Sequence, residues 1–522
     1  MCYDDIMTKN DFIAIASPNQ FEIKIPYHSE SNIRKIDYHT NIYFFIPKNL
    51  NINPVSYTNK NFYNDYISYI RFITPHKRLG VLERRLKTLI APLNKSTYDE
   101  SSKTTFEEEL KLIVCSYVSY LGKYSKELAH KDIQIKRLHT FLQRVENFHT
   151  LMKTMLETAS DKQDNDIIDC ILSASEYLSY ASQNCLLEIN VHLKTYEGTY
   201  DNTINTIVGI INTIIASSKE NDFPVISNDT YQNEKVIYRH SILKKYFYSI
   251  LYLYQKKKRD GGGIKEVYYA IAAGLSMVFT TLIVFATQKE YGNFTTSFFA
   301  ALVISYMFKD RIKEAYRSYF DKRMALKTYD YKEKIYSSDK KLIFAFIKER
   351  MRFIEKKNLQ DNIKKTRLIE VPRRLTTYLE EDIIKFEKSV TVYNKNIQRK
   401  YKNTINGIHN IMRFDISQYL KKMDATKVPL YRVNEHRLFG NKIYHVNIVI
   451  ENKTETGTDL YRARIIINKR GIKRIELPES GLKIFPKDNT VKKKSWFSLK
   501  KSGLIRKTSV KLKQKKDLSP EE

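Results

Sequence analysis

The chain has 522 residues, a length that allows two to four domains, and it carries a formal net charge of +31 at pH 7. This excess of positive charge would suit anionic lipid, nucleic acid or an acidic protein. The 15 glycines are few for this length, and the GxxxxGKS/T, GxGxxG, HExxH and GxSxG patterns are absent. The commonest phosphate-binding loops, zinc-protease sites and serine-hydrolase elbows are therefore excluded.

Cysteine and histidine usage predicts neither a disulfide framework nor a metal centre. The four cysteines are Cys2, Cys115, Cys170 and Cys185. They form no CxxC pair, which favours free thiols in a reducing compartment. His130, His139 and His149 share one region, but their separations do not place them on one helical face. We therefore expect no metal, no cofactor and no catalytic residue marked by a motif.

Residues 1–80 predict a region that contains a β-hairpin. Apolar side chains alternate with period two over residues 21–27 and again over residues 36–46, with turn-forming residues between the two runs. The first residues, MCYDDIMTKNDF, lack a basic start followed by an apolar core, so no signal peptide is expected.

Residues 81–260 predict a cytoplasmic helical bundle, because the spacing of apolar residues changes to three and four. Thr105-x-x-Glu108 resembles a capping box. Apolar stripes over residues 106–128 and 138–155 indicate two long helices, and further helices fit the chain up to residue 257. The three glycines at 261–263 should break the last helix and act as a swivel.

Residues 264–308 predict a transmembrane helical hairpin. Residues 267–287 form an uncharged run of about 21 residues, or roughly 31 Å of helix, close to the ~30 Å hydrocarbon core of a bilayer. Residues 291–308 form a second uncharged run of about 18 residues, or roughly 27 Å. Only Lys289 and Glu290 separate the runs. The alternative is a hairpin buried in a soluble domain, but such helices normally carry a polar stripe that residues 267–287 lack.

The charged residues that flank the two runs predict their orientation. Positive charge stays on the cytoplasmic side, so both soluble regions and both termini are expected in the cytoplasm, at a bacterial inner (plasma) membrane. The basic flanks are Lys256, Lys257, Lys258, Arg259 and Lys265 before the first run and Lys309, Arg311, Lys313 and Arg317 after the second.

Small residues four apart predict the faces on which the two helices pack, because helix backbones can approach closely there. The predicted packing residues are Ala270, Gly274 and Thr281 on the first helix and Ser297, Ala301 and Ser305 on the second.

The C-terminal half predicts helices, a small sheet and a tail. Residues 309–425 are expected to form a cytoplasmic helical region with a helix over 339–357. Residues 426–482 are expected to form an antiparallel β meander that could pair with the N-terminal strands. Residues 483–522 predict a basic disordered tail, whose aromatic and basic side chains are expected to contact the membrane surface. These are Lys492, Lys493, Lys494, Trp496, Phe497, Lys500 and Lys501.

The expected fold class is α+β, mainly α, with small antiparallel β elements near both termini. The spacings Ser241-x-x-Lys244 and Ser337-x-x-Lys340 lack the partner motifs of serine–lysine hydrolases. We therefore expect a non-enzymatic scaffold at the lipid bilayer that binds another protein or itself. The alternatives are a membrane-anchored enzyme whose site no motif marks, and a membrane-tethered nucleic-acid binder, with nucleic acid the less favoured partner.

Overall fold

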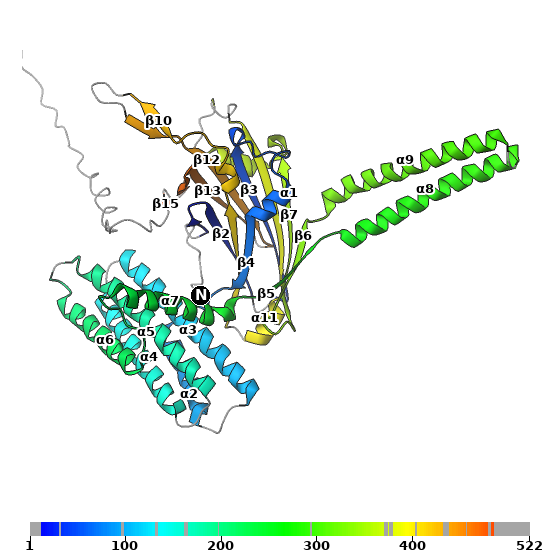
Figure 1. Cartoon of the computed structure of the whole chain (residues 1–522). Helices are drawn as coiled ribbons and strands as arrows, with labels where there is room; N and C mark the ends of the chain where they lie inside the picture. The colour runs from blue at the N-terminus through cyan, green and yellow to red at the C-terminus, as the bar shows by residue number, and fades with distance from the viewer. Residues whose placement is uncertain are drawn as a thin grey trace, which may run out of the picture.

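The computed structural model describes residues 12–30, 33–94, 99–130, 134–160, 165–196, 198–292, 295–369, 374, 379–401, 404–431, 438–455, 457–478 and 482–484. Figure 1 shows three parts: two layered β-sheets, a helical bundle beside them, and a long helical hairpin that projects from one edge of the larger sheet.

A nine-stranded sheet forms the larger layer, in the order β15-β14-β13-β12-β3-β8-β7-β6-β5, with neighbouring strands antiparallel. Its strands are β3 (Ile36–Pro47), β5 (Tyr254–Arg259), β6 (Tyr331–Tyr336), β7 (Ile343–Ile354), β8 (Glu381–Val392), β12 (Tyr444–Lys453), β13 (Thr458–Asn468), β14 (Gly471–Leu477) and β15 (Leu482–Ile484). Ile42 of β3 lies opposite Ile450 of β12. The pairing considered for the N-terminal and C-terminal strands is therefore present.

A four-stranded sheet, in the order β1-β2-β9-β4, packs on the larger one. Its strands are β1 (Ile13–Ser17), β2 (Gln20–His28), β9 (Gly407–Asp415) and β4 (Tyr66–Phe72). Aromatic rings join the layers: Phe44 of β3 lies 5.1 Å from Phe414 of β9, and Tyr66 of β4 lies 5.0 Å from Phe386 of β8. The two sheets therefore share one apolar core.

Short helices and a ribbon complete the sheet domain. The helices are α1 (Asn59–Asp65), α10 (Asp361–Leu368), α11 (Asn394–Tyr401) and α12 (Ser417–Leu420). β10 (Lys427–Leu430) and β11 (Leu438–Asn441) pair with each other as a two-stranded ribbon that projects from the sheets (Figure 1).

The helical bundle comprises α2 (Leu79–Ile90), α3 (Glu100–His130), α4 (Ile135–Ser160), α5 (Asn165–Leu193), α6 (Asp201–Glu220) and α7 (Thr230–Tyr248). In α4, Leu138, Leu142 and Val145 are buried at the spacing that the sequence indicated. The last predicted helix ends earlier than expected: α7 stops at Tyr248, and residues 254–259 form β5, because they pair with β6 at the sheet edge.

The hairpin consists of α8 (Gly262–Tyr291) and α9 (Thr296–Lys327). The expected glycine swivel is not observed. Gly261 has φ +74° and precedes the first residue of α8, whereas Gly262 and Gly263 lie inside the helix. Gly261 therefore lies between β5 and α8, and the next two glycines begin α8 rather than break a preceding helix.

The prediction of two membrane-spanning helices is wrong. Among the described residues, α8 is the one helix long and apolar enough, by length and composition, to cross a membrane. The second uncharged run is interrupted, because α8 continues to Tyr291 and α9 begins only at Thr296. About 13 residues, or roughly 20 Å of helix, then precede Lys309, which is short of the ~30 Å that a full crossing needs.

The expected mainly helical class with small β elements is also wrong, because the structure is mixed and contains large sheets. Within residues 309–425, β6, β7, β8 and β9 follow the end of α9. β7 replaces the helix expected over 339–357. Its side chains alternate between buried and partly exposed, but the buried face includes Glu349, which obscures the period-two pattern in the sequence.

Candidate functional site

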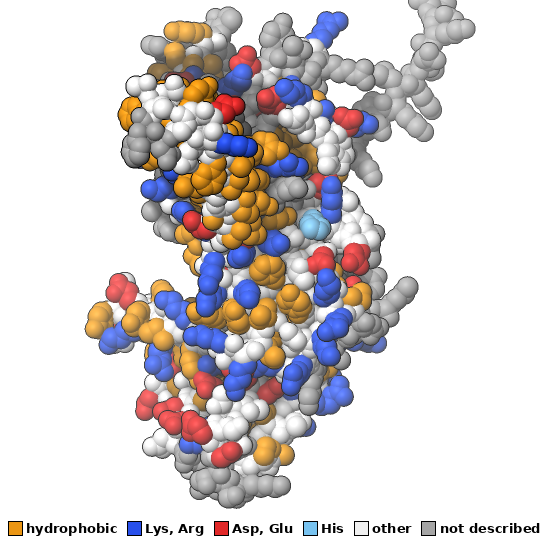
Figure 2. All heavy atoms as spheres, turned by 90° about the vertical axis from the view of Figure 1, so that its right-hand side faces the viewer, with side chains coloured by type: hydrophobic (Ala, Val, Ile, Leu, Met, Phe, Trp, Pro, Cys, Tyr) orange, Lys and Arg blue, Asp and Glu red, His pale blue; other side chains and the backbone are white. Residues whose placement is uncertain are grey.

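The hairpin exposes a dense group of apolar side chains. On α8, Val278, Leu282 and Phe285 are 57%, 63% and 63% exposed, and on α9, Phe299 and Met307 are 68% and 66% exposed. Only 17% of the most apolar stretch of α8 is buried. Figure 2, seen from the side to which the hairpin projects, shows apolar side chains gathered on it. The alternative of a helical hairpin buried in a soluble core therefore does not hold.

The two helices pack along a seam of small and hydroxyl-bearing side chains. Ala272, Ser276 and Thr280 of α8 and Ser305 of α9 are buried. Thr280 Oγ1 donates to the Ser276 carbonyl at 3.0 Å and lies 3.5 Å from the Ser305 carbonyl oxygen. Small residues therefore bring the helices together, as they do in membrane-embedded helix pairs.

The six predicted packing residues differ in how far the structure buries them between the helices. Ser305 lies in the seam and Ala301 is partly buried, whereas Ala270, Gly274 and Ser297 are exposed. Thr281 Oγ1 donates to the Met277 carbonyl of its own helix. The observed seam keeps the four-residue spacing but starts two residues later on α8, which turns it by roughly 200° around the helix. Residue size alone did not specify which face packs.

A polar and aromatic neck joins the two helices near the sheet. Asp321 of α9 accepts hydrogen bonds from Tyr269 of α8 at 2.8 Å and 2.9 Å, and Lys265 lies 3.0 Å from the same carboxylate. Tyr268 stacks on Phe320 with 4.6 Å between ring centroids. The hydrogen bonds from Lys265 and Tyr269 lower the pKa of Asp321. This neck marks the sheet-proximal end of the apolar part of the hairpin.

A buried ionic cluster lies where the hairpin strands join the sheet core. Glu349 of β7 lies 2.8 Å from Lys388 Nζ of β8 and 2.7 Å from Lys257 Nζ of β5, and it accepts a 2.8 Å hydrogen bond from Tyr66. Lys388 also donates to Tyr66 at 3.0 Å. Glu333 of β6 is buried nearby. Two lysines and two glutamates thus meet between the sheets.

The pKa values of these groups follow from burial and pairing. Burial alone would raise the pKa of Glu349, but the ammonium groups of Lys388 and Lys257 outweigh it and lower that pKa to about 2. Burial lowers the pKa of Lys388 and raises that of Glu333. The side chains of Glu349 and Lys388 are 1% and 0% exposed, so a substrate cannot reach them. This cluster joins strands β5, β7 and β8.

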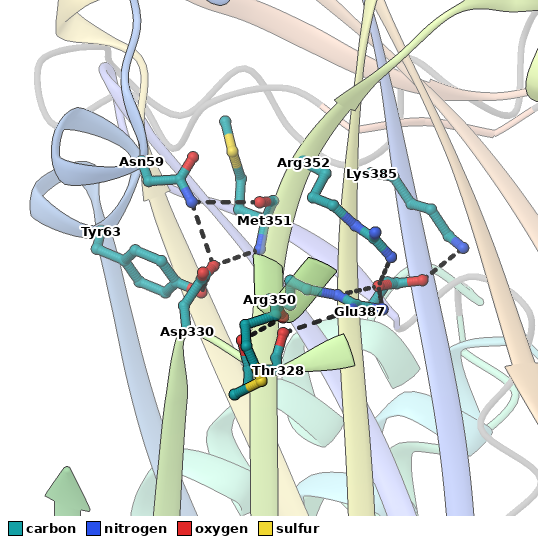
Figure 3. Close-up of polar contacts among 10 residues, drawn as sticks. Asn59, Tyr63, Thr328, Asp330, Arg350, Met351, Arg352, Lys385 and Glu387 are labelled. Atoms are coloured by element: carbon teal, nitrogen blue, oxygen red, sulfur yellow. Dashed lines mark hydrogen bonds and ion pairs between the residues drawn. The ribbon is translucent and has the colours of Figure 1, made fainter. Parts of the chain in front are cut away.

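A second polar network lies on the opposite face of β7 and β8, as Figure 3 shows. Glu387 accepts hydrogen bonds from Arg350 at 2.6 Å and from Arg352 at 3.0 Å, and Lys385 Nζ lies 2.6 Å from it. Arg350 also donates to the Thr328 carbonyl, just after α9, at 3.4 Å. The network therefore ties the end of the hairpin to the sheet.

Asp330 forms a third contact at the base of the hairpin. Its carboxylate accepts hydrogen bonds from Tyr63 at 3.0 Å, from the Met351 backbone N–H at 2.8 Å and from Asn59 at 3.4 Å (Figure 3). Its backbone N–H donates to the Glu349 carbonyl at 2.8 Å. Together with the pairing of β5 and β6, these contacts hold both ends of the hairpin at the same sheet edge.

Other residues considered from the sequence take structural positions. Ser241 Oγ donates to the Tyr238 carbonyl at 2.7 Å, and Ser337 bonds to Asp339, so neither serine is paired with the lysine three residues later. Within the described ranges, no group of three or more His, Cys, Asp and Glu side chains could hold a metal ion. The predicted tail contacts from Lys492 to Lys501 lie outside the described residues.

Sequence reasoning missed the buried ionic cluster. The sequence indicated a role for Lys257 only in the basic flank of a membrane span. It indicated no role for Glu349 and Lys388, because charged residues are usually exposed. No local signal joins three positions that are brought together only by strand register. Comparison of the chain with protein-family models, curated proteins and solved structures finds no match.

Proposed function

We propose that this protein is a non-enzymatic scaffold anchored to a membrane by the α8–α9 hairpin. The observation that carries the proposal is the apolar surface of α8, which is long enough to cross a bilayer yet largely uncovered. Contiguous apolar patches on a folded protein mark a membrane or a protein partner. A partner protein alone would not need an apolar surface that extends around the helix, whereas lipid contacts a helix from every free side.

The soluble parts lie on one side of the membrane in this proposal. β5 leads into α8 and β6 follows α9, and these strands pair, with Arg259 opposite Tyr331. Both ends of the hairpin therefore leave from one place. The basic side chains around that place, such as Lys256, Lys258 and Lys332, favour the cytoplasmic face. The apolar part of α9 is shorter than that of α8, and both ends of the hairpin stay at the sheet, so the anchor enters the bilayer from one side and neither helix has to span it.

The scaffold role is supported by a second exposed surface. The β10–β11 ribbon projects from the sheets (Figure 1) and exposes Leu430, Leu438 and Phe439 by 51%, 46% and 58%. Exposed apolar strands are surfaces on which another chain can pack. The partner would be another protein or a second copy of this chain.

A vesicle flotation experiment tests the anchor. The full chain is mixed with detergent-solubilised lipid, the detergent is removed, and the vesicles are floated in a density gradient. We expect the protein to float and to resist alkaline carbonate extraction. Leu282→Arg places a charge on the apolar face at a cost of about 2.5–3.5 kcal/mol, and should reduce the floated fraction roughly 100-fold.

Val55→Arg is the matched control, because Val55 is 90% exposed and lies outside the hairpin. It should float like the unchanged protein. A full chain that stays monodisperse in buffer without detergent and remains at the bottom of the gradient would refute the anchor.

A further inference from the structure

An arginine-lined cleft lies in the helical bundle, between α2, α3 and α4. Its volume is about 1050 Å³, in the range of small-molecule sites. Its basic lining consists of Arg78 just before α2, Arg84 in the middle of α2, and Arg137 and Arg144 from α4. Figure 1 shows this part of the bundle away from the hairpin. Its role is independent of the membrane anchor.

The guanidinium groups outnumber the carboxylates that neutralise them. Arg144 lies 2.9 Å from Glu83, and Arg137 lies 3.4 Å from Glu127, whose side chain is one-third exposed. Glu83 Oε1 is buried without a hydrogen-bond partner, whereas Oε2 makes the contact to Arg144. Four positive groups thus face two negative ones, and the cleft keeps a net positive charge.

The charges of several arginines act on the same tyrosine hydroxyl. Burial raises the pKa of Tyr120, and the positive charges of Arg137, Arg78 and Arg144 all oppose that rise. Three guanidinium groups from two helices therefore lie within electrostatic reach of one hydroxyl. Arg137 also lies over the Tyr124 ring, 5.7 Å from its centroid. Tyr120 and Tyr124 of α3 also line the cleft, and Tyr124 is buried against Phe141.

Gly80 allows Arg144 to reach the first turn of α2. A Cβ at this position would lie 2.4 Å from Arg144 Nη1. A cation at the positive end of a helix is unfavourable unless an anion is nearby, and Arg78, immediately before α2, adds a second one. Glu83 supplies part of the compensation. A bound anion would supply the rest.

We propose that this cleft binds a small molecule with two or more linked phosphate groups. Arg137 and Arg144 are seven residues apart on α4, or roughly 10.5 Å along the helix. A diphosphate or longer group offers oxygens to both guanidinium groups at once. Arginine binds phosphate oxygens in pairs through its two terminal nitrogens, so each guanidinium group is suited to one phosphate of such a ligand.

Isothermal titration calorimetry on the purified full chain in detergent tests the cleft, with inorganic phosphate, pyrophosphate and adenosine diphosphate as probes at low salt. We expect pyrophosphate to bind and inorganic phosphate to bind at least tenfold more weakly. Tighter binding of adenosine diphosphate than of pyrophosphate would identify a nucleotide as the ligand class. Equal binding would identify the phosphates alone.

Substitutions locate the binding. Arg78→Ala and Arg137→Ala should each raise the Kd for pyrophosphate about tenfold or more. Lys153→Ala is the control, because Lys153 lies on α4 with a 59% exposed side chain and does not line the cleft. Gly80→Ala should weaken binding by displacing the Arg144 guanidinium while raising thermal stability, since alanine favours the helix. A loss of both binding and thermal stability in Gly80→Ala would indicate misfolding.

Two results would overturn the proposal. One is the absence of measurable heat with pyrophosphate and adenosine diphosphate at millimolar concentration. The other is binding that Arg78→Ala and Arg137→Ala leave unchanged relative to Lys153→Ala, because the anion would then bind elsewhere on this basic chain.

Discussion

Glu349 and Lys388 face each other across β7 and β8, with 2.8 Å between Oε1 and Nζ and side chains that are 1% and 0% exposed. Glu349 also contacts Lys257 of β5, the strand that leads into the hairpin. A charge pair that spans the central and edge strands in this way couples the position of the hairpin to the sheet core. The contribution of this ion pair to stability depends on both partners being present, because a buried charge without a partner is strongly destabilising.

We predict that the two ends of this pair are not equivalent. Glu349→Gln removes the carboxylate that both Lys388 and Lys257 contact and should lower the free energy of unfolding by about 3–5 kcal/mol. Lys388→Met should cost only about 2 kcal/mol, because Lys257 still compensates Glu349. Urea-induced unfolding of the full chain, followed by circular dichroism, measures both.

Lys385→Met is the control for this comparison. Lys385 is partly exposed and shares Glu387 with Arg350 and Arg352, so its removal should cost less than about 1 kcal/mol. Equal losses of unfolding free energy for Glu349→Gln and Lys385→Met would show that the buried cluster contributes no more to stability than the partly exposed network around Glu387.

A second prediction concerns acid sensitivity of the helical bundle. His149 of α4 is half-buried, and Nε2 lies 2.9 Å from Ser182 Oγ, which also bonds to Tyr117. Burial lowers the pKa of His149 to about 4, from the ordinary value of 6.5. The unfolded chain therefore takes up a proton below pH 6.5, while the folded protein does not until about pH 4.

The contribution of His149 to stability is therefore fully present above pH 6.5 and is lost as the pH falls toward 4, by about 3 kcal/mol. The pKa of His409 is also lowered by burial, to about 3, so the unchanged protein combines both effects. The difference in unfolding free energy between the protein and His149→Gln, measured from pH 7 to pH 4, isolates His149. A difference that stays constant over this range would contradict the prediction.

The sequence predicted strands and helices whose pattern is local but not the partners of the strands. Residues 21–27 and 36–46 lie in β2 and β3, yet these strands belong to different sheets and do not pair as the expected hairpin. The apolar stripe of α4, with Leu138 and Val145, needed only its own helix to be recognised. β7 was expected to be a helix because Glu349 sits at an inward position among Ile347 and Met351. That glutamate is buried only because Lys388, distant in sequence, lies opposite it. The arginine cleft likewise requires α2 and α4 to meet, which no local motif reports.

A third prediction separates the observed hairpin seam from the one inferred from residue size. Ser276 is fully buried against α9, so Ser276→Leu should force the helices apart at a cost of about 1–3 kcal/mol. A Cβ added to Gly274 meets nothing within 4 Å, so Gly274→Leu should be tolerated. The two substitutions place the same leucine side chain two residues apart on the same helix.

Thermal unfolding in detergent measures the outcome. The melting temperature should fall for Ser276→Leu and stay unchanged or rise for Gly274→Leu, because glycine is a poor helix residue. The reverse order would place the packing face on Ala270 and Gly274.

The last prediction concerns the basic tail. Trp496 is the one tryptophan in the chain, so the tryptophan fluorescence of the full protein reports on this position alone. If the hairpin holds the protein at a bilayer, the tail meets lipid at high effective concentration. Basic residues gain about 1 kcal/mol each near an anionic surface, and aromatic rings favour the interface.

We therefore expect the emission of Trp496 to shift to shorter wavelength when the full chain is reconstituted into anionic vesicles, and less so in zwitterionic ones. Added salt should reverse the shift, because the attraction of Lys492, Lys493 and Lys494 to the surface is screened. Replacing these three lysines by glutamine should abolish the difference between the two lipid compositions while leaving flotation unchanged, since the hairpin is intact. Equal emission spectra in anionic vesicles, zwitterionic vesicles and detergent would show that the tail does not contact lipid.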